Sequence, residues 1–395
     1  MVAGNKSQES YLEQEQLDPR ADTVLSELEE WLEKQASKSA EEGDALSGSQ
    51  SHKNLAEDII IPITYNEIED LLGRGTVGQV FKVRLQIKNQ KLSANPPPKF
   101  ALKTFPPRGI RTKHDFENEI SLLQALAYRP HQHIVTHFAS WTHGFSSYIL
   151  FPLADDNLRS FLNTEPPPQI NTKFTLWLLK QLKGLAEALD RLHGPHIDYG
   201  DSTEPVEIGF HHDLKPANIL VFKQSGQEGV VLKICDFGSG RINVIIPQES
   251  CSSPCTSNPG TGDPAYCAPE ILEEGKTSRP KDVWSFGCIL IDILQWVFAG
   301  PYFTPDQFRL ARMEFREGQY QGYSAFWYKD PKANKVLLKP PVEECLAHLR
   351  LKTRENIVFS GIYTLISKMI LTDPRQRPNI GEICNGLATL LKEVN

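Results

Sequence analysis

Two short runs of residues constrain the fold of this chain most, because each carries oxygen ligands for a hard cation and they lie apart in the sequence. The first run, HHDLKPAN, spans residues 211–218, and the second, DFG, spans residues 236–238. Asp213, Asn218 and Asp236 offer carboxylate and amide oxygens, which suit Mg²⁺. Asp213 can also accept a proton from a hydroxyl group. A chain that uses both runs together must fold so that they meet at one site.

A glycine-rich turn and a lysine in an apolar strand precede these runs. The turn contains Gly73, Gly75 and Gly78, and glycines let backbone amides approach phosphate oxygens, although such a turn can also be an ordinary loop. A strand follows it, whereas a dinucleotide-binding turn opens a helix. Lys103, within FALKTF at 100–105, is either a phosphate ligand or a strand-edge lysine that reaches solvent. Taken in order with the acidic runs, these features predict phosphoryl transfer from ATP.

Hydrophobic periodicity divides the chain into a strand-rich part and a helix-rich part. Alternating residues predict strands at 80–83, 100–105 and 148–151. Helical spacing predicts helices at 114–126, 172–192, 281–299, 305–318, 342–349, 361–371 and 380–394. We therefore expect an α+β fold of two lobes, residues 58–153 and 154–395, with a nucleotide cleft between them. On the first predicted helix, Glu119 is the expected partner of Lys103, and Glu117 is the alternative.

The net charge of −7 is concentrated in the first part of the chain. Residues 1–57 hold 13 acidic and 5 basic side chains, so the remainder is close to neutral. This composition predicts a mostly disordered acidic leader. Within it, residues 21–36 have helical spacing and form either a marginal helix on the folded body or a docking helix for a partner. A nucleic-acid partner is not expected, because no concentrated basic face is visible.

The apolar segments and cysteines predict an intracellular protein, cytoplasmic or nuclear. No secretory signal precedes the body, and the longest apolar run, 288–298, contains Asp292. That run is expected to be a buried helix rather than a membrane span. Seven cysteines without a signal predict reduced thiols. Nothing in the sequence indicates an oligomeric state.

The order of these motifs resembles the eukaryotic protein kinase family from about residue 65 to residue 394. Further matching motifs are APE at 268–270, DVWSFG at 282–287 and DPRQRP at 373–378. Asp213-Leu214-Lys215 is the form that resembles serine/threonine kinases. The resemblance implies a bilobal kinase fold, with a small antiparallel sheet and one helix in the first lobe and a larger helical second lobe. It also implies protein substrates with Ser or Thr acceptors.

For the nucleotide, the resemblance implies a set of contacts to phosphates and adenine. Gly73, Gly75 and Gly78 would cover the phosphates of ATP, and Lys103, held by Glu119, would bind the α and β phosphates. The implied adenine pocket comprises Val80, Ala101 and Leu220, with Leu150 at its back and Phe151 and Leu153 in the hinge.

For catalysis, the resemblance implies four further roles. Asp213 would orient and deprotonate the acceptor hydroxyl, and Lys215 would neutralise charge on the transferred group. Asn218 and Asp236 would hold Mg²⁺. A buried ion pair between Glu270 and Arg377 is expected to support the substrate-binding loop.

The chain departs from the family pattern at two positions near the site. His212 replaces the arginine that commonly pairs with a phosphate on the activation loop. Histidine is mostly neutral near pH 7, so we hypothesise that the enzyme does not need activation-loop phosphorylation. Asp263 stands where a threonine is usual, although a two-residue insertion would make Thr261 the equivalent. Ala217, where some basic-directed kinases carry glutamate, makes arginine-rich substrates less expected.

Two segments, 194–209 and 300–341, look inserted. Within the second, 325–328 and 335–338 predict an extra hairpin. Both insertions are either surface decoration or docking surfaces for a partner or substrate.

Cys251 and Cys255 lie in the activation loop. They are expected to be either exposed thiols without function or a redox-sensitive pair.

Two other functions remain open at this stage. Because His212 and Asp263 are unusual, the chain could instead be a pseudokinase that binds nucleotide without turnover. A small-molecule phosphotransferase would share the cleft and metal ligands, but the APE segment argues against it, because that segment shapes a peptide-docking loop.

Overall fold

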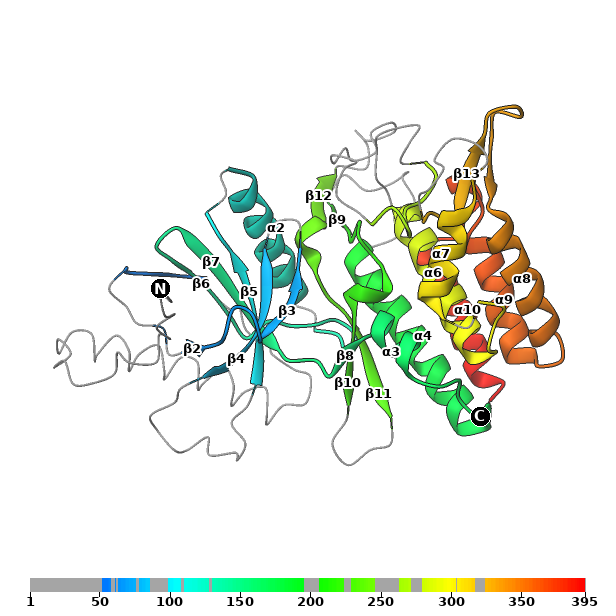
Figure 1. The fold of residues 1–395 in the computed structure, drawn as a ribbon, viewed down its shortest axis with the longest axis horizontal. Coiled ribbons are helices and arrows are strands. Elements are labelled where there is room, and N and C mark those ends of the chain that lie inside the picture. The colour runs from blue at the N-terminus through cyan, green and yellow to red at the C-terminus, as the bar shows by residue number, and fades with distance from the viewer. Residues whose placement is uncertain are drawn as a thin grey trace, which may run out of the picture.

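A computed structural model describes thirteen stretches of the chain. They are residues 52–57, 61, 63–75, 78–85, 99–107, 110–127, 130–194, 206–223, 229–245, 263–270, 279–302, 304–316 and 324–394. Across these residues a sheet-rich lobe lies beside a larger helical lobe (Figure 1), which confirms the predicted two-lobed α+β fold. The predicted leader helix at 21–36, most of the segment 194–209, and Thr261, Cys251 and Cys255 lie outside the described residues.

The first lobe is built on one twisted sheet. Its strands run in the order β1-β6-β7-β5-β4-β2, with β3 also paired to β4, and every pairing except the parallel β1–β6 is antiparallel. The strands are β1 Lys53–Leu55, β2 Ile63–Thr64, β3 Leu71–Arg74, β4 Gln79–Leu85, β5 Lys99–Phe105, β6 Ala139–His143 and β7 Ser146–Pro152. Helix α2, Ile110–Ala127, connects β5 to β6 in the chain.

The two faces of this sheet pack against different cores. Phe81, Leu102 and Leu150 belong to one buried cluster. Phe105 and Ile149 belong to the other, which continues into the second lobe. Since successive residues of a strand point to opposite faces, Lys103 lies on the face of Phe105 and Ile149. The sheet therefore presents Lys103 toward the helical part of the molecule.

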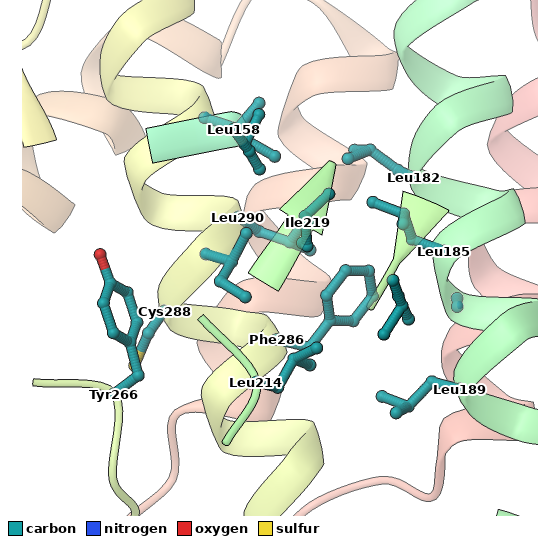
Figure 2. Close-up of a cluster of buried hydrophobic side chains, with 14 of the residues drawn as sticks. Leu158, Leu182, Leu185, Leu189, Leu214, Ile219, Tyr266, Phe286, Cys288 and Leu290 are labelled. Carbon is teal, nitrogen blue, oxygen red and sulfur yellow. The ribbon is translucent and has the colours of Figure 1, made fainter. Parts of the chain in front are cut away.

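The second lobe is organised around α6, Arg279–Val297, whose residues from Lys281 to Val297 are all buried. A helix that is apolar on every side must be surrounded by other elements. Figure 2 shows Phe286 of α6 directed toward Leu185 of α4. The surrounding helices are α3 Leu158–Thr164, α4 Thr172–His193, α7 Pro305–Glu314, α8 Pro340–Thr353, α9 Ile357–Met369 and α10 Ile380–Lys392.

Short strands and turns complete the second lobe. Strands β8, β10 and β11 form one small antiparallel sheet, β9 and β12 a second, and β13 and β14 a hairpin. Their bounds are β8 Asp156–Asn157, β9 Val206–Phe210, β10 Ile219–Lys223, β11 Val230–Ile234, β12 Arg241–Ile245, β13 Trp327–Asp330 and β14 Lys335–Leu338. Single 3₁₀ turns follow at η2 Pro216–Asn218, η3 Phe237–Ser239 and η4 Pro374–Gln376. The hairpin predicted from 325–328 and 335–338 is confirmed.

Helix ends differ from the sequence prediction where capping and packing decide them. Helix α9 begins at Ile357, four residues before the predicted start at Gly361, because the Asn356 side chain accepts hydrogen bonds from the amides of the first turn. Gly361 is a packing residue rather than a helix breaker, since a Cβ there would lie 2.3 Å from Leu390. Helix α7 ends at Glu314, four residues before the predicted end.

Two further properties concern membranes and thiols. None of the helices within the described ranges combines the length and hydropathy needed to cross a bilayer. The cysteines in those ranges, Cys235, Cys267, Cys288, Cys345 and Cys384, are free thiols.

Candidate active site

The ammonium of Lys103 joins two carboxylates that come from different elements. From β5, its Nζ donates to Glu119 Oε1 and Oε2 on α2 at 2.8 and 2.6 Å. It also donates to Oδ1 of Asp236, just before η3, at 2.7 Å. The alternative partner Glu117 lies on the exposed side of α2, 3.8 Å from Lys113. The triad therefore ties β5, α2 and the DFG turn together.

Burial and charge oppose each other in this triad. Burial alone would lower the pKa of Lys103, but the carboxylates of Asp236 and Glu119 outweigh it and raise that pKa. Burial would raise the pKa of Asp236, and the Lys103 ammonium overrides it, so that pKa falls to about 2. At Glu119, burial prevails over Lys103 and raises the pKa to about 7. Near neutral pH Lys103 is thus cationic and Asp236 anionic.

Gly238 fits tightly against the triad. A Cβ at this position would lie 2.9 Å from Glu119 Oε2 and 3.6 Å from Lys103 Nζ. Any side chain would have to displace the ion pair. Asp236, two residues earlier, has φ 63°, a left-handed conformation that turns this segment sharply.

Asp213 is held by contacts on both oxygens of its carboxylate. Lys215 Nζ donates to Oδ2 at 2.7 Å, and the backbone N–H of Asp263 donates to Oδ1 at 2.8 Å. The Asn218 amide nitrogen donates to the Asp213 carbonyl at 2.9 Å and to Oδ2 at 3.2 Å. Three donors, the Lys215 ammonium, the Asn218 amide and the Asp263 backbone N–H, thereby fix the direction of the carboxylate and balance its charge.

The backbone just before Asp213 is held by a buried carboxylate of α6. Asp282 accepts from the backbone N–H groups of His211 and His212 at 2.9 and 3.0 Å, and pairs with His193 Nε2 at 2.9 Å. Burial alone would raise the pKa of Asp282, but the His193 contact and neighbouring charges hold it well below its usual range. His212 has φ 68°, a strained conformation for a non-glycine residue that costs about 1–3 kcal/mol. The sequence reading gave Asp282 no role; its signal was an acidic residue in the first turn of an otherwise apolar helix.

The run at 211–218 and the DFG run at 236–238 meet in the structure, as expected from the sequence. His211 Nε2 contacts the Cys235 carbonyl at 2.9 Å, and Cys235 N–H donates to the Asn218 carbonyl at 3.0 Å. Lys103 engages Asp236 through Oδ1, and Asn218 turns its amide nitrogen toward Asp213. Oδ2 of Asp236 and Oδ1 of Asn218 are the oxygens suited to a cation. Two protein oxygens completed by substrate phosphates is a usual arrangement for Mg²⁺, so the residues fit this ion.

Three of the expected adenine-pocket residues, Val80, Ala101 and Phe151, share one face of the first-lobe sheet. Val80 pairs with Lys103, and Phe151 pairs with Ala101. Val80, Ala101, Phe151, Leu153 and Leu220 are all half-buried, as residues lining a cleft would be.

The prediction for Leu150 was wrong. Its side chain is 1% exposed and packs on the opposite face of the sheet, with Leu102, which is its direct partner across β5 and β7. A one-residue difference in register reverses the face to which a strand residue points. Phe151, opposite Ala101, lies on the face that carries Lys103 instead.

The three glycines of the turn differ in their surroundings. Gly75 N–H donates to the Gly78 carbonyl at 2.8 Å and closes the turn. A Cβ at Gly78 would lie 2.4 Å from the Thr104 carbonyl, whereas one at Gly73 would meet nothing within 4 Å. Only Gly78 is therefore required by close packing of the turn on β5.

The expected ion pair between Glu270 and Arg377 is confirmed. Arg377 donates from Nη1 and Nη2 to the two Glu270 oxygens at 2.6 and 2.8 Å, and its side chain is fully buried. Asp263 turns its own carboxylate to the Ala265 N–H at 2.9 Å. The Asp263 carboxylate is thus engaged within its own turn, and Asp263 contacts Asp213 through its backbone N–H.

Comparison with known proteins shows the family of this chain. Residues 66–387 match the protein kinase domain. The chain belongs to the protein kinase domain family. Among similar proteins, serine/threonine-protein kinase TIO of Arabidopsis thaliana is 28% identical over 63% of this chain, and mitogen-activated protein kinase kinase kinase 5 of Homo sapiens is 29% identical over 68%. Probable serine/threonine-protein kinase PBL25 of Arabidopsis thaliana is 27% identical over 57%.

The similarity is confined to part of these relatives. The matched region makes up 16% of the first two proteins and 51% of the third. The comparison therefore concerns the kinase domain and not the remaining parts of those proteins.

Proposed function

We propose that this protein is an active serine/threonine protein kinase, which transfers the γ-phosphoryl group of Mg-ATP to a hydroxyl group of protein substrates. One observation carries the proposal: Lys103 bridges Glu119 and Asp236 while Asp213 is independently oriented. A phosphate-binding cation, a carboxylate for the metal and a carboxylate for the acceptor thus stand in one assembled site. The names of the similar proteins, all kinases, support the same reading.

Each residue has a defined task in this reaction. Lys103 binds the α and β phosphates, and Glu119 keeps its ammonium in place. Asp213 orients the acceptor hydroxyl and takes up its proton as the oxygen attacks the γ phosphorus and the bond to the β-phosphate oxygen breaks. Lys215 faces the negative charge of the transferred group. These groups act by positioning and electrostatics, because the transition state requires little covalent help.

Asn218 and Asp236 would hold Mg²⁺, which would supply positive charge to the phosphates. The remaining work of the first lobe is to bind the nucleotide. Gly73, Gly75 and Gly78 lie over the phosphates, and Val80, Ala101 and Leu220 enclose the adenine. Leu153 and its neighbours offer backbone groups to the adenine edge.

The site does not depend on a phosphate contact at His212. This side chain is 4% exposed and stacks on Phe210 at a ring distance of 5.3 Å. A buried ring stacked on Phe210 cannot readily reach a loop phosphate, whereas the position of Asp213 is fixed by contacts from Lys215, Asn218 and Asp263. We therefore propose that transfer does not require activation-loop phosphorylation.

The test is phosphoryl transfer by the purified chain with Mg²⁺, γ-labelled ATP and a panel of generic proteins, followed by acid hydrolysis of the labelled product. Label on phosphoserine or phosphothreonine, lost with Asp213→Asn, supports the proposal. ATP binding without transfer indicates a pseudokinase. Label found only on a small alcohol added as competitor indicates a small-molecule phosphotransferase.

A further inference from the structure

Strand β1 lies upstream of the kinase domain match yet belongs to the kinase sheet. Lys53–Leu55 precede residue 66, where the match begins. They pair in parallel with β6, with Lys53 opposite Trp141 and Leu55 opposite His143. Without this strand, β6 would present an unpaired edge. Residues 52–57, here called the flanking strand, are therefore an integral part of the first lobe.

His52, at the start of the flanking strand, connects β6 to α2. Its Nδ1 lies 3.2 Å from Ser140 Oγ and its Nε2 lies 3.0 Å from Thr142 Oγ1. Its ring meets the ring of Phe116 on α2 edge to face, with a centroid distance of 5.2 Å. A neutral imidazole has one donor and one acceptor, and burial lowers the pKa of His52, so both hydroxyl contacts can form together.

A continuous series of contacts leads from His52 to the ammonium of Lys103. Phe116 packs on Phe105 of β5 at a ring distance of 5.2 Å. The ring of Phe105 lies 5.3 Å from Lys103 Nζ. Phe116 also stands three residues before Glu119, on the same side of α2. A rotation of α2 that breaks the His52 contact would therefore also move Glu119 away from Lys103.

We propose that His52 is a positioning residue, which acts through Phe116 to hold α2 where Glu119 pairs with Lys103. The flanking strand thus makes the chain upstream of the kinase domain a part of the catalytic arrangement. The effect on turnover rests on the proposed kinase activity, whereas the effect on α2 does not.

The experiment compares the full-length chain with three variants by hydrogen exchange and by steady-state kinetics. His52→Ala removes the ring and both hydroxyl contacts. His52→Phe restores a ring against Phe116. Asn54→Ala is the matched control, because Asn54 is exposed on the same strand.

We expect His52→Ala to raise amide exchange in residues 110–127 while exchange in α6 stays unchanged. Its kcat should fall about three- to tenfold, the size of one lost hydrogen-bonded ring contact, with the KM for protein substrate unchanged. His52→Phe should recover part of both effects, and Asn54→Ala should match the wild type.

The proposal is overturned if exchange in α2 is unaffected by His52→Ala, or if it rises equally in α6, which would indicate a general loss of stability. It is also overturned if His52→Phe behaves as His52→Ala, since the path runs through Phe116. If the wild type transfers no phosphate, the proposed function fails, and hydrogen exchange still decides whether His52 positions α2.

Discussion

The buried pair of Glu270 and Arg377 gives the sharpest stability prediction. Arg377 donates to both Glu270 oxygens and also to the carbonyls of Pro280 and Leu371 at 3.0 and 2.7 Å, and its guanidinium lies 5.0 Å from the Trp284 ring. In Glu270→Gln the backbone contacts remain, but the buried guanidinium loses its counter-charge and meets an amide N–H.

The expected cost is large because the charge cannot reach water. Removing one partner of a buried pair destabilises a protein by about 3–5 kcal/mol. With an unfolding entropy of about 2.1 cal/mol/K per residue over the matched domain, 66–387, the melting temperature should fall by about 4–7 °C. Differential scanning calorimetry measures this shift directly.

Arg375 provides the matched control two residues away. Its side chain is 88% exposed and pairs with Asp373 across 3.1 Å. An exposed pair contributes little, so Arg375→Gln should leave the melting temperature within experimental error. Equal shifts for Glu270→Gln and Arg375→Gln, or no shift for either, would refute the assignment of stability to burial of the pair.

Three further predictions concern the nucleotide turn, the docking loop and pH. Gly78→Ala should raise the KM for ATP by roughly tenfold, because a forced main-chain shift costs about 1–3 kcal/mol. Gly73→Ala, with open space around its Cβ, should leave that KM unchanged. Initial rates measured at increasing ATP concentrations test both variants. Trp327 of the β13–β14 hairpin donates its indole N–H to the Cys267 carbonyl, just before the APE segment, at 2.8 Å. Because we expect that segment to shape the substrate-docking loop, Trp327→Phe should raise the KM for protein substrate about three- to tenfold by losing one hydrogen bond, with kcat unchanged. Trp177→Phe removes a similar indole bond to a remote carbonyl and should leave that KM unaltered; identical behaviour of the two variants would exclude a role for the hairpin. Burial lowers the pKa of His137 from 6.5 to about 4, so the unfolded chain gains a proton first, and the free energy of unfolding falls as the pH drops from 6.5 toward 4. In urea unfolding at pH 7.5 and 4.5, His137→Gln should lose roughly 2–3 kcal/mol less of its free energy of unfolding than the wild type does. Equal losses would contradict the buried neutral state.

Long elements and strongly ordered motifs could be predicted from the sequence. The helix at 172–192 was expected almost to its observed bounds, because leucines recur along many turns. The structure adds that the Asn171 side chain caps its start. The convergence of 211–218 with 236–238 followed from their shared need for one cation. The partner Glu119 followed from its place on the helix after the Lys103 strand.

Features that depend on neighbouring segments could not be predicted. The face of Leu150 depends on the register between β5 and β7, which a short apolar run does not specify. Arg312 is fully buried between the rings of Phe308 and Phe326, 4.2 and 4.0 Å from its guanidinium carbon, although a surface position is usual for arginine. The strands β8 to β12 are two to five residues long and exist only through their pairing.

The flanking strand and Asp282 are two features near the site whose roles could not be predicted from the sequence. The flanking strand contributes through backbone pairing, which leaves no motif in the sequence. Asp282 opens the DVWSFG motif, but the motif alone does not show that its carboxylate accepts hydrogen bonds from the N–H groups of His211 and His212. The catalytic residues were recognisable because their chemistry is carried by their own side chains.

The rate of γ-phosphoryl transfer by phosphatase-treated protein tests the central claim most directly, namely that the chain assembles a complete catalytic site by itself. We expect the treated wild type to transfer phosphate to Ser or Thr at its original rate. We also expect Asp213→Asn to retain its ATP affinity and to be slower by about 10²–10⁴-fold, the usual contribution of a positioned base. Activity that disappears on phosphatase treatment, or that survives intact in Asp213→Asn, would contradict it.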